Sequence, residues 1–222
     1  MKSVRWALTS AREKGLVTTA TIAGTVVVDL LFDWRYGTDT MGWVERDALD
    51  TASANKVHSA RYSATKARPL TRLMRSLALP RDGTFVDIGS GKGRVLLIAS
   101  QFGFRKVVGI EFSEHLARLA RANVETFAKV RPLGSPIEIV QTDATSYPFE
   151  ADERVFFLFN PFDAVVLEQV LENLGRSLES SPRTIWLIYN TPLHDDVVRA
   201  SSLFTHGAYY EIGGNRFRVY TN

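Results

Sequence analysis

Short apolar runs alternate with helical segments along the chain after Pro80. Each run is nearly continuous in apolar and β-branched residues, as in strands that are buried on both faces of a parallel sheet. The segments between the runs place apolar residues at helical spacing. The pattern therefore predicts five β-strands joined by helical crossovers, over residues 84–88, 106–111, 137–141, 154–159 and 184–189.

The end of the chain carries two further β-rich runs, at residues 204–212 and 216–221, around Gly213-Gly214-Asn215. Glycine and asparagine adopt the left-handed backbone of tight turns, so these runs predict an antiparallel hairpin. Together the runs predict an α/β fold with a seven-stranded, mostly parallel sheet and helices on both faces. Helices are expected over residues 94–102, after the cap residue Ser113, and from the cap residue Asp163 to Gly175.

The first part of the chain has a weaker pattern. Residues 1–55 are expected to form a helical and irregular extension, and residues 56–222 the main domain. Residues 56–81 hold seven Lys or Arg and no acid, which with their apolar spacing predicts one amphipathic helix with a basic outer face. The apolar residues at helical spacing are Leu70, Leu73, Met74 and Leu77.

Residues 16–28 form an apolar run that follows several basic residues and ends at Asp29. The run is shorter than the roughly 18 residues of a membrane span, and no A-x-A-type cleavage site follows it. We therefore expect a cytoplasmic protein. Its N-terminal helix is expected either to pack on the domain or to lie peripherally on a membrane surface.

The composition excludes several classes of protein. The 222 residues contain no cysteine, which excludes a disulfide scaffold, a Cys nucleophile and an iron–sulfur protein. The net charge of +3 does not by itself indicate nucleic acid. The four histidines lack metal-like spacing and no G-x-S-x-G elbow occurs, so neither a metal site nor hydrolase chemistry is expected.

A glycine-rich turn, Gly89-Ser90-Gly91-Lys92-Gly93, follows the first predicted strand, which carries Asp87 near its end. Glycines let the backbone turn tightly and approach a ligand closely. A phosphate-binding P-loop requires Ser or Thr after the lysine, where this chain has Gly93, and a dinucleotide turn prefers G-x-G-x-x-G. The turn alone is weak evidence, and its meaning depends on the neighbouring strand ends.

Polar residues stand at the next three strand ends. Glu111 follows Gly89 by 22 residues, and its carboxylate can accept hydrogen bonds from both hydroxyls of a ribose. Asp143 can accept a hydrogen bond from an adenine amine, and Asn160-Pro161-Phe162 ends the fourth strand. Because ligands of open α/β sheets bind at the carboxyl ends of the strands, these groups are expected to form one site.

On these motifs the chain resembles the class I S-adenosylmethionine-dependent methyltransferases from about Tyr62 to its end. The matching segments are DIGSGKG (87–93), GIEFS (109–113), QTDA (141–144), FLFNPF (157–162) and the closing hairpin. The resemblance implies a Rossmann-like sheet of strand order 3-2-1-4-5-7-6 and S-adenosyl-L-methionine as the cofactor. It places Asp87 and the glycines near the methionine moiety, Glu111 on the ribose and Asp143 on the adenine.

A closer likeness rests on Tyr62-Ser63-Ala64-Thr65 together with FNPF, which resemble motifs of the histone lysine methyltransferases named for disruption of telomeric silencing. In that family a Y-x-x-T segment holds the methionine carboxylate and an Asn-x-Phe motif lines the lysine channel, although Pro161 stands where the family has a second Asn. Bacterial proteins of unassigned substrate share an FDxRYGxDT segment, matched by residues 32–40. The resemblance implies cofactor contacts by Tyr62, Thr65, Asp87, Gly89, Ser90, Gly91, Gly93, Glu111, Phe112, Asp143, Ala144 and Asn160, and catalytic roles for Asn160 and Phe162.

We therefore expect a methyltransferase that acts on an amine, such as a protein lysine or a small amine, with residues 1–80 forming the lid and acceptor surface. The expected pocket lining is aromatic, because a dry pocket favours the neutral form of an amine. It comprises Phe159, Phe162, Tyr189 and Tyr147, with Asn160 and Asn190 as neutral acceptors.

Three alternatives stay open at this point. The acceptor can be a small molecule or a lipid-linked one, as the apolar N-terminal run suggests. The protein can be a non-catalytic module that binds S-adenosylmethionine or a partner. The basic segment 56–81 can bind nucleic acid. The sequence does not determine the oligomeric state.

Overall fold

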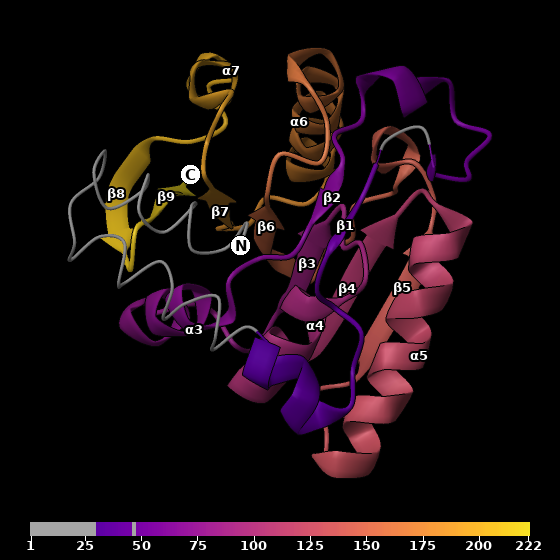
Figure 1. The fold of residues 1–222 in the computed structure, drawn as a ribbon. Coiled ribbons are helices and arrows are strands. Elements are labelled where there is room, and N and C mark those ends of the chain that lie inside the picture. Colours follow the sequence, from indigo (N-terminus) through magenta and orange to yellow (C-terminus); the bar gives the residue numbers. More distant parts are fainter. Residues whose placement is uncertain (1–29, 46–47) are drawn as a thin grey trace, which may run out of the picture.

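The structure is a computed structural model that describes residues 30–45 and 48–222. Its centre is a seven-stranded sheet with the spatial order β5-β4-β3-β6-β7-β9-β8 (Figure 1). Numbered along the chain, the sheet strands follow the order 3-2-1-4-5-7-6, which confirms the expected topology. The strands are β3 (Thr84–Ile88), β4 (Lys106–Glu111), β5 (Ile137–Gln141), β6 (Glu153–Leu158), β7 (Trp186–Asn190), β8 (His206–Ile212) and β9 (Asn215–Thr221).

Strands β3 to β7 pair in parallel, whereas β9 runs antiparallel to both β7 and β8. All five residues of β3 are buried, as expected for the central strand of a sheet that is covered on both faces. The expected C-terminal hairpin is confirmed, and both Gly213 and Gly214 adopt the left-handed backbone of its turn.

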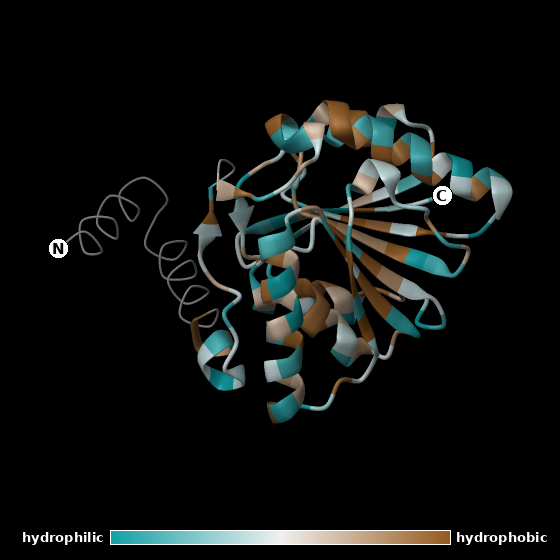
Figure 2. Ribbon diagram, turned by 90° about the vertical axis from the view of Figure 1, so that its right-hand side faces the viewer, coloured by the Kyte–Doolittle hydropathy of each residue, from teal (hydrophilic) through white to brown (hydrophobic). Residues whose placement is uncertain are grey.

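Two layers of helices cover the sheet (Figures 1 and 2). Helices α6 and α7 bury apolar residues on one face, and α3 and α4 do so on the other, where α5 also packs against β4 and β5. The helices are α3 (Ala67–Ser76), α4 (Arg94–Ala99), α5 (Glu114–Val130), α6 (Ala164–Ser180) and α7 (Asp195–Ala200), with short 3-10 turns η2 (Ala54–His58), η3 (Ser100–Phe102) and η4 (Ala144–Ser146).

Ser113 and Asp163 cap α5 and α6 as expected, since each side chain accepts hydrogen bonds from backbone N–H groups of the first turn. The expected end of α6 at Gly175 is wrong, because the helix continues to Ser180. A Cβ atom on Gly175 would lie 3.2 Å from a methyl group of Leu203, so the missing side chain serves close packing inside the helix.

The expectation of one helix over residues 56–81 is also wrong. Only α3 is helical in the second half of this range, where Leu70, Leu73 and Met74 are buried as expected. Before it, Tyr62–Ser63 forms strand β2, which pairs antiparallel with β1 (Trp43–Val44). Before β2, residues 54–58 form a 3-10 helix, and Ser59 forms a β-bridge with Phe162 after β6.

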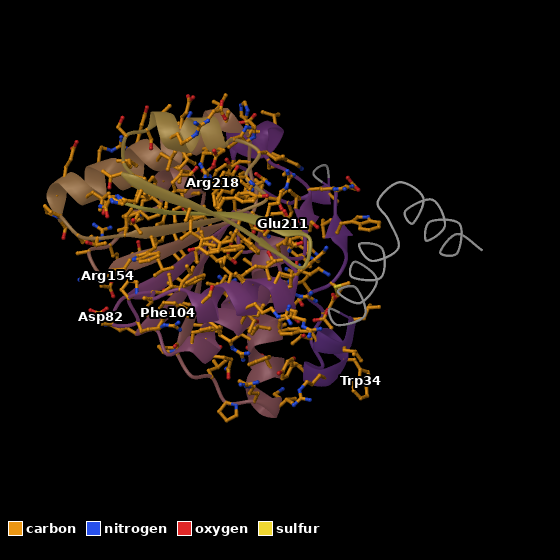
Figure 3. All side chains as sticks on the ribbon, turned by 90° about the vertical axis from the view of Figure 1, so that its left-hand side faces the viewer. Trp34, Asp82, Phe104, Arg154, Glu211 and Arg218 are labelled. Carbon is orange, nitrogen blue, oxygen red and sulfur yellow. The ribbon has the colours of Figure 1, made fainter. Side chains whose placement is uncertain are left out.

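Residues 30–36 are helical, and residues 1–29 lie outside the described part of the chain, as does the expected helix at 16–28. Trp34 is 82% exposed and stands at the margin of the molecule (Figure 3). Within residues 30–45 and 48–222, no helix is both long enough and apolar enough to cross a bilayer. Asp82, Phe104 and Arg154 mark the amino-terminal edge of the sheet (Figure 3).

Candidate functional site

A pocket lies at the carboxyl ends of β3 to β6, where the strand order reverses on either side of β3. Every expected cofactor or catalytic residue lines it except Gly93. Gly93 precedes α4 with a φ of 85° and packs against Ala120 of α5, so its role in the structure is to join the turn to the helix. The expected residues in the lining are Tyr62, Thr65, Asp87, Gly89, Ser90, Gly91, Glu111, Phe112, Asp143, Ala144, Asn160 and Phe162.

The glycine turn forms one wall of the pocket. Gly91 has a φ of 54°, and a Cβ atom there would lie 2.2 Å from the ring of Tyr62. A Cβ atom on Gly89 would lie 2.3 Å from the Cβ of Pro161. Between them, the Ser90 hydroxyl is buried without a hydrogen-bond partner among the described residues. The turn therefore needs glycine at both positions and offers one polar atom that no described residue satisfies.

Two buried carboxylates face the pocket from adjacent strands. Glu111 is 3% exposed and accepts hydrogen bonds from the backbone N–H groups of Gly91 (2.8 Å) and Ser113 (2.9 Å). Burial raises the pKa of Glu111 to about 7 despite these bonds. Burial, with the nearby charge of Glu111, raises the pKa of Asp87 well above its usual range. A cation bound beside Asp87 would favour the ionised form of both groups.

Asp143, at the end of β5, is held differently. Its Oδ2 accepts hydrogen bonds from Ser53 Oγ and from Asn55 Nδ2 (2.9 Å), and its Oδ1 accepts from the Thr145 backbone N–H (2.9 Å). Partial burial raises the pKa of Asp143, but the hydrogen bonds from Ser53, Thr145 and Asn55 outweigh burial and lower it overall. The Asp143 carboxylate, which is expected to bind adenine, thus accepts hydrogen bonds from Ser53 and Asn55 of the segment before α3.

That segment, residues 50–63, crosses the carboxyl edge of the sheet, and we call it the strap (Figure 1). Asp50 accepts hydrogen bonds at the start of α5, from Ser113 Oγ (2.6 Å) and the His115 N–H (2.9 Å). At the end of β6, the Ala60 N–H donates to the Pro161 carbonyl (2.9 Å). The strap therefore touches the ends of β4, β5 and β6 in turn before Tyr62 returns to the glycine turn of β3.

Residues 32–41 form hydrogen bonds with Arg94, which follows the glycine turn, and with Tyr62, which packs on it. Asp33 accepts hydrogen bonds from Thr40 Oγ1 (2.6 Å), the Met41 N–H (2.7 Å) and Arg94 Nη2 (3.1 Å). The Arg94 side chain is 2% exposed and also donates from Nε to Thr40 Oγ1 (2.7 Å). The Thr40 carbonyl in turn accepts from the Tyr62 hydroxyl (2.7 Å). Residues of the motif at 32–40 thus form a polar network that joins the helix at residues 30–36 to the strap and to the helix after the glycine turn.

Asn160 and Phe162 follow β6 and flank Pro161, which packs against Gly89 of the glycine turn. Phe159 also lines the pocket, as expected, whereas Tyr147, Tyr189 and Asn190 do not. Tyr189 and Asn190 are each 1% exposed and lie at the end of β7, and Tyr147 is 6% exposed. The expectation that these three residues line the pocket is therefore wrong.

Sequence reasoning missed the strap residues that complete the site, above all Asp50, Ser53 and Asn55. Their types gave a signal, since Asp, Ser and Asn in an irregular segment typically bind backbone or neighbouring polar groups. Nothing in the sequence identified their partners, which are 63 to 90 residues away along the chain.

Comparison with known families gives a match to "Histone methylation protein DOT1" over residues 46–160, more than half of the chain. The matched region runs from the strap through the glycine turn to Asn160, and so includes most of the pocket. The chain belongs to the DOT1 family.

Two curated relatives are similar over shorter stretches. The mouse "Adenine nucleotide translocase lysine N-methyltransferase" is 42% identical over 60 residues, which is 27% of this chain and 26% of that protein. A "Protein-lysine N-methyltransferase" of Saccharolobus islandicus is 31% identical over 65 residues, which is 29% of this chain and 40% of that protein. The chain thus aligns with well under half the length of either relative.

A solved S-adenosylmethionine-dependent methyltransferase from Aquifex aeolicus superposes with a TM-score of 0.54 and 17% sequence identity, covering 68% of this chain and 87% of that one. At this identity the likeness shows the fold, which is the Rossmann-like fold of class I methyltransferases.

The residues present fit S-adenosylmethionine as the cofactor of this family. Its methionine end carries cationic groups, which suit the Asp87 carboxylate, and none of the described residues donates a hydrogen bond to that carboxylate. Its ribose hydroxyls suit Glu111, whose carboxylate lines the pocket and can accept hydrogen bonds besides those from backbone N–H groups. The orphaned Ser90 hydroxyl supplies a further polar contact in the same wall.

Proposed function

We propose that the protein is an S-adenosylmethionine-dependent methyltransferase that methylates an amine, with the side chain of a protein lysine as the acceptor. The observation that carries the proposal is the grouping of Asp87, Glu111 and Asp143 with the FNPF segment around one pocket closed by the strap. Family membership and the printed names of the two curated relatives support lysine as the acceptor.

In this proposal the cofactor supplies an activated methyl group on a sulfonium. The acceptor nitrogen forms a bond to the methyl carbon while the carbon–sulfur bond breaks, leaving S-adenosylhomocysteine, and the nitrogen loses one proton. The chain's own residues hold the two reactants in line, because placing them about 3 Å apart supplies most of the rate enhancement. Asp87, Tyr62 and Thr65 hold the methionine end, Glu111 the ribose and Asp143 the adenine.

The acceptor amine must be neutral when it attacks. For a lysine with a pKa near 10.4, deprotonation at pH 7 costs roughly 4.6 kcal/mol. Phe159 and Phe162 reduce this cost, because an apolar surface disfavours the ammonium form. Asn160 contributes a neutral polar group beside them, which does not stabilise the ammonium as a carboxylate would.

Calorimetric titration with S-adenosylhomocysteine tests the cofactor assignment. We expect Asp87→Ala and Glu111→Ala to bind at least tenfold more weakly than wild type, and Lys106→Ala to bind as wild type does because its ion pair with Glu138 lies outside the pocket lining. Wild-type protein that does not bind at high micromolar ligand would contradict the proposal.

Incubation of a cell lysate with tritiated S-adenosylmethionine tests the acceptor. We expect label in the protein fraction, and methyl-lysine after hydrolysis of that fraction. Label in the lipid or small-molecule fraction instead would favour the rival acceptors. Cofactor binding without labelling of any fraction would favour a non-catalytic module, and label in nucleic acid would show a different acceptor class.

We also propose that the protein works in the cytoplasm in peripheral contact with a membrane surface. The support is an exposed apolar face on the helix at residues 30–36, where Leu30, Leu31 and Trp34 are 54%, 50% and 82% exposed. This face directly follows the apolar sequence at 16–28. Co-flotation with anionic phosphatidylglycerol vesicles, lost in Trp34→Ala, is the expected result; no flotation of wild type would contradict it.

A further inference from the structure

Two non-glycine residues with left-handed backbone lie at neighbouring strand ends beside the pocket. Asn160, after β6, has a φ of 44°, and Thr191, after β7, has a φ of 51°. Such conformations cost about 1–3 kcal/mol each and persist only where the surroundings hold them, often at functional sites. Of these two residues, only Asn160 lines the pocket.

The Asn160 carboxamide joins the two strand ends. Its Nδ2 donates to the Thr191 carbonyl (2.7 Å), and its Oδ1 accepts from the Tyr189 hydroxyl (2.6 Å) and more weakly from the Leu193 N–H (3.3 Å). An amide oxygen has two lone pairs, so both are used within the chain. One Nδ2 hydrogen is left, and the orientation of the carboxamide is fixed by three partners on one side.

Tyr189 makes the shortest of these bonds. Its side chain is 1% exposed and belongs to the core between the sheet and α6, beneath the pocket and outside its lining. Its hydroxyl also accepts from the His194 N–H (3.2 Å), directly before α7. Burial raises the pKa of Tyr189 to about 12, so the hydroxyl is protonated and donates throughout the neutral range.

We infer that Tyr189 is a positioning residue for methyl transfer, whose hydroxyl fixes the Asn160 carboxamide and the turn at residues 191–194 beside the acceptor. The inference rests on the proposed function and adds to it a residue that touches neither reactant. A displacement of about 1 Å at a reacting centre costs on the order of a hundredfold in rate. Without the hydroxyl, Asn160 Oδ1 keeps only its weak bond to Leu193, and the bond from Nδ2 to the Thr191 carbonyl alone fixes the carboxamide.

The cofactor side does not depend on this hydroxyl. Asp87, Glu111 and Asp143 stand at the ends of β3, β4 and β5, on the other side of β6 from Tyr189. Loss of the hydroxyl should therefore separate two quantities that a general loss of structure would change together: the rate of transfer and the affinity for S-adenosylhomocysteine.

Tyr189→Phe tests the inference, with Tyr147→Phe as a matched control. Tyr147 is a buried tyrosine of the same core, and its hydroxyl donates to Glu153 Oε1 over the same 2.6 Å, but it does not line the pocket. We expect both variants to melt a few degrees lower. Tyr189→Phe should transfer label from tritiated S-adenosylmethionine to lysate protein at least tenfold more slowly, with S-adenosylhomocysteine affinity within twofold of wild type. Tyr147→Phe should keep both within twofold.

The outcomes separate the inference from the proposed function. A wild-type rate in Tyr189→Phe would overturn the inference, and so would a loss of rate and affinity in parallel. The Asn160 side-chain amide signals in ¹⁵N spectra should shift in Tyr189→Phe and stay in place in Tyr147→Phe, and unshifted signals would overturn the inference without any assay of transfer. Wild-type protein that labels no fraction would contradict the proposed function itself.

Discussion

Replacement of Gly91 by alanine is the most direct test of how the pocket is closed. Gly91 has a φ of 54°, and its added Cβ would lie 2.2 Å and 2.3 Å from two ring carbons of Tyr62. The ring cannot simply swing away, because its hydroxyl is bound to the Thr40 carbonyl at 2.7 Å. Either the strap or the glycine turn must shift.

The expected cost has two parts. Alanine in left-handed backbone costs roughly 1–2 kcal/mol, and overpacking adds about 1–3 kcal/mol, for a sum of about 2–5 kcal/mol. For a chain of this size, each kcal/mol lowers the melting temperature by roughly 2–4 °C, so Gly91→Ala should melt at least about 4 °C lower. Since the displaced groups line the cofactor side, S-adenosylhomocysteine affinity should fall at least tenfold by calorimetry.

Gly214→Ala isolates the backbone part of this cost. Gly214 has a φ of 74°, but nothing lies within 4 Å of its added Cβ, and it sits in the hairpin turn away from the pocket. This control should lose about 1–2 kcal/mol and bind S-adenosylhomocysteine normally. If Gly91→Ala is no less stable than Gly214→Ala and keeps wild-type affinity, Tyr62 does not close the pocket over the turn as the structure implies.

Four other predictions concern charged groups and backbone strain. S-adenosylhomocysteine should bind more tightly as pH rises from 6 to 8, because Glu111, with a pKa of about 7, accepts ribose hydroxyls best when ionised; calorimetry should find a flatter profile in Glu111→Gln. By the same raised pKa, the ligand-free protein loses stability from this group as pH rises from about 4.5 to 7, which thermal melts can follow. Asp33→Asn should lower the free energy of unfolding by about 3–5 kcal/mol in chemical denaturation, because it breaks the buried ion pair with Arg94. Its control, Asp39→Asn, has a side chain that is 69% exposed, and should lower the free energy of unfolding by no more than about 1 kcal/mol. Ser202→Gly should raise the melting temperature by about 2–4 °C, because Ser202 is exposed and has a φ of 55°; an unchanged or lower value would contradict strain at that position.

The parallel sheet was predictable because its signals are local. The central strand Thr84–Ile88 carries the apolar residues Phe85, Val86 and Ile88, and the glycine turn directly after it needs left-handed backbone that only glycine adopts cheaply. The carboxylates of Glu111 and Asp143 then fall at the next strand ends by simple counting. Each of these inferences uses residues that are close together along the chain.

The predictions that were wrong depend on contacts between residues that are far apart along the chain. Residues 56–66 form no α-helix because residues 58–63 pair with residues 161–163 and 43–44, and local spacing does not show these contacts. Gly175 is inside α6 because Leu203 packs there. Tyr189 and Asn190 stand at a strand end, which predicts a place in the pocket, but both side chains are buried outside its lining.

Residues 33–41, which precede the family match at 46–160, support one wall of the pocket without lining it. Tyr62 closes the pocket over the glycine turn, and its hydroxyl is held by Thr40. Thr40 is held in turn by Asp33 and by the buried guanidinium of Arg94, which opens the helix after that turn. Hydrogen bonds of 2.6–2.7 Å therefore connect the helix at residues 30–36, through Thr40, with Tyr62 in the wall of the pocket and with Arg94 at the start of α4.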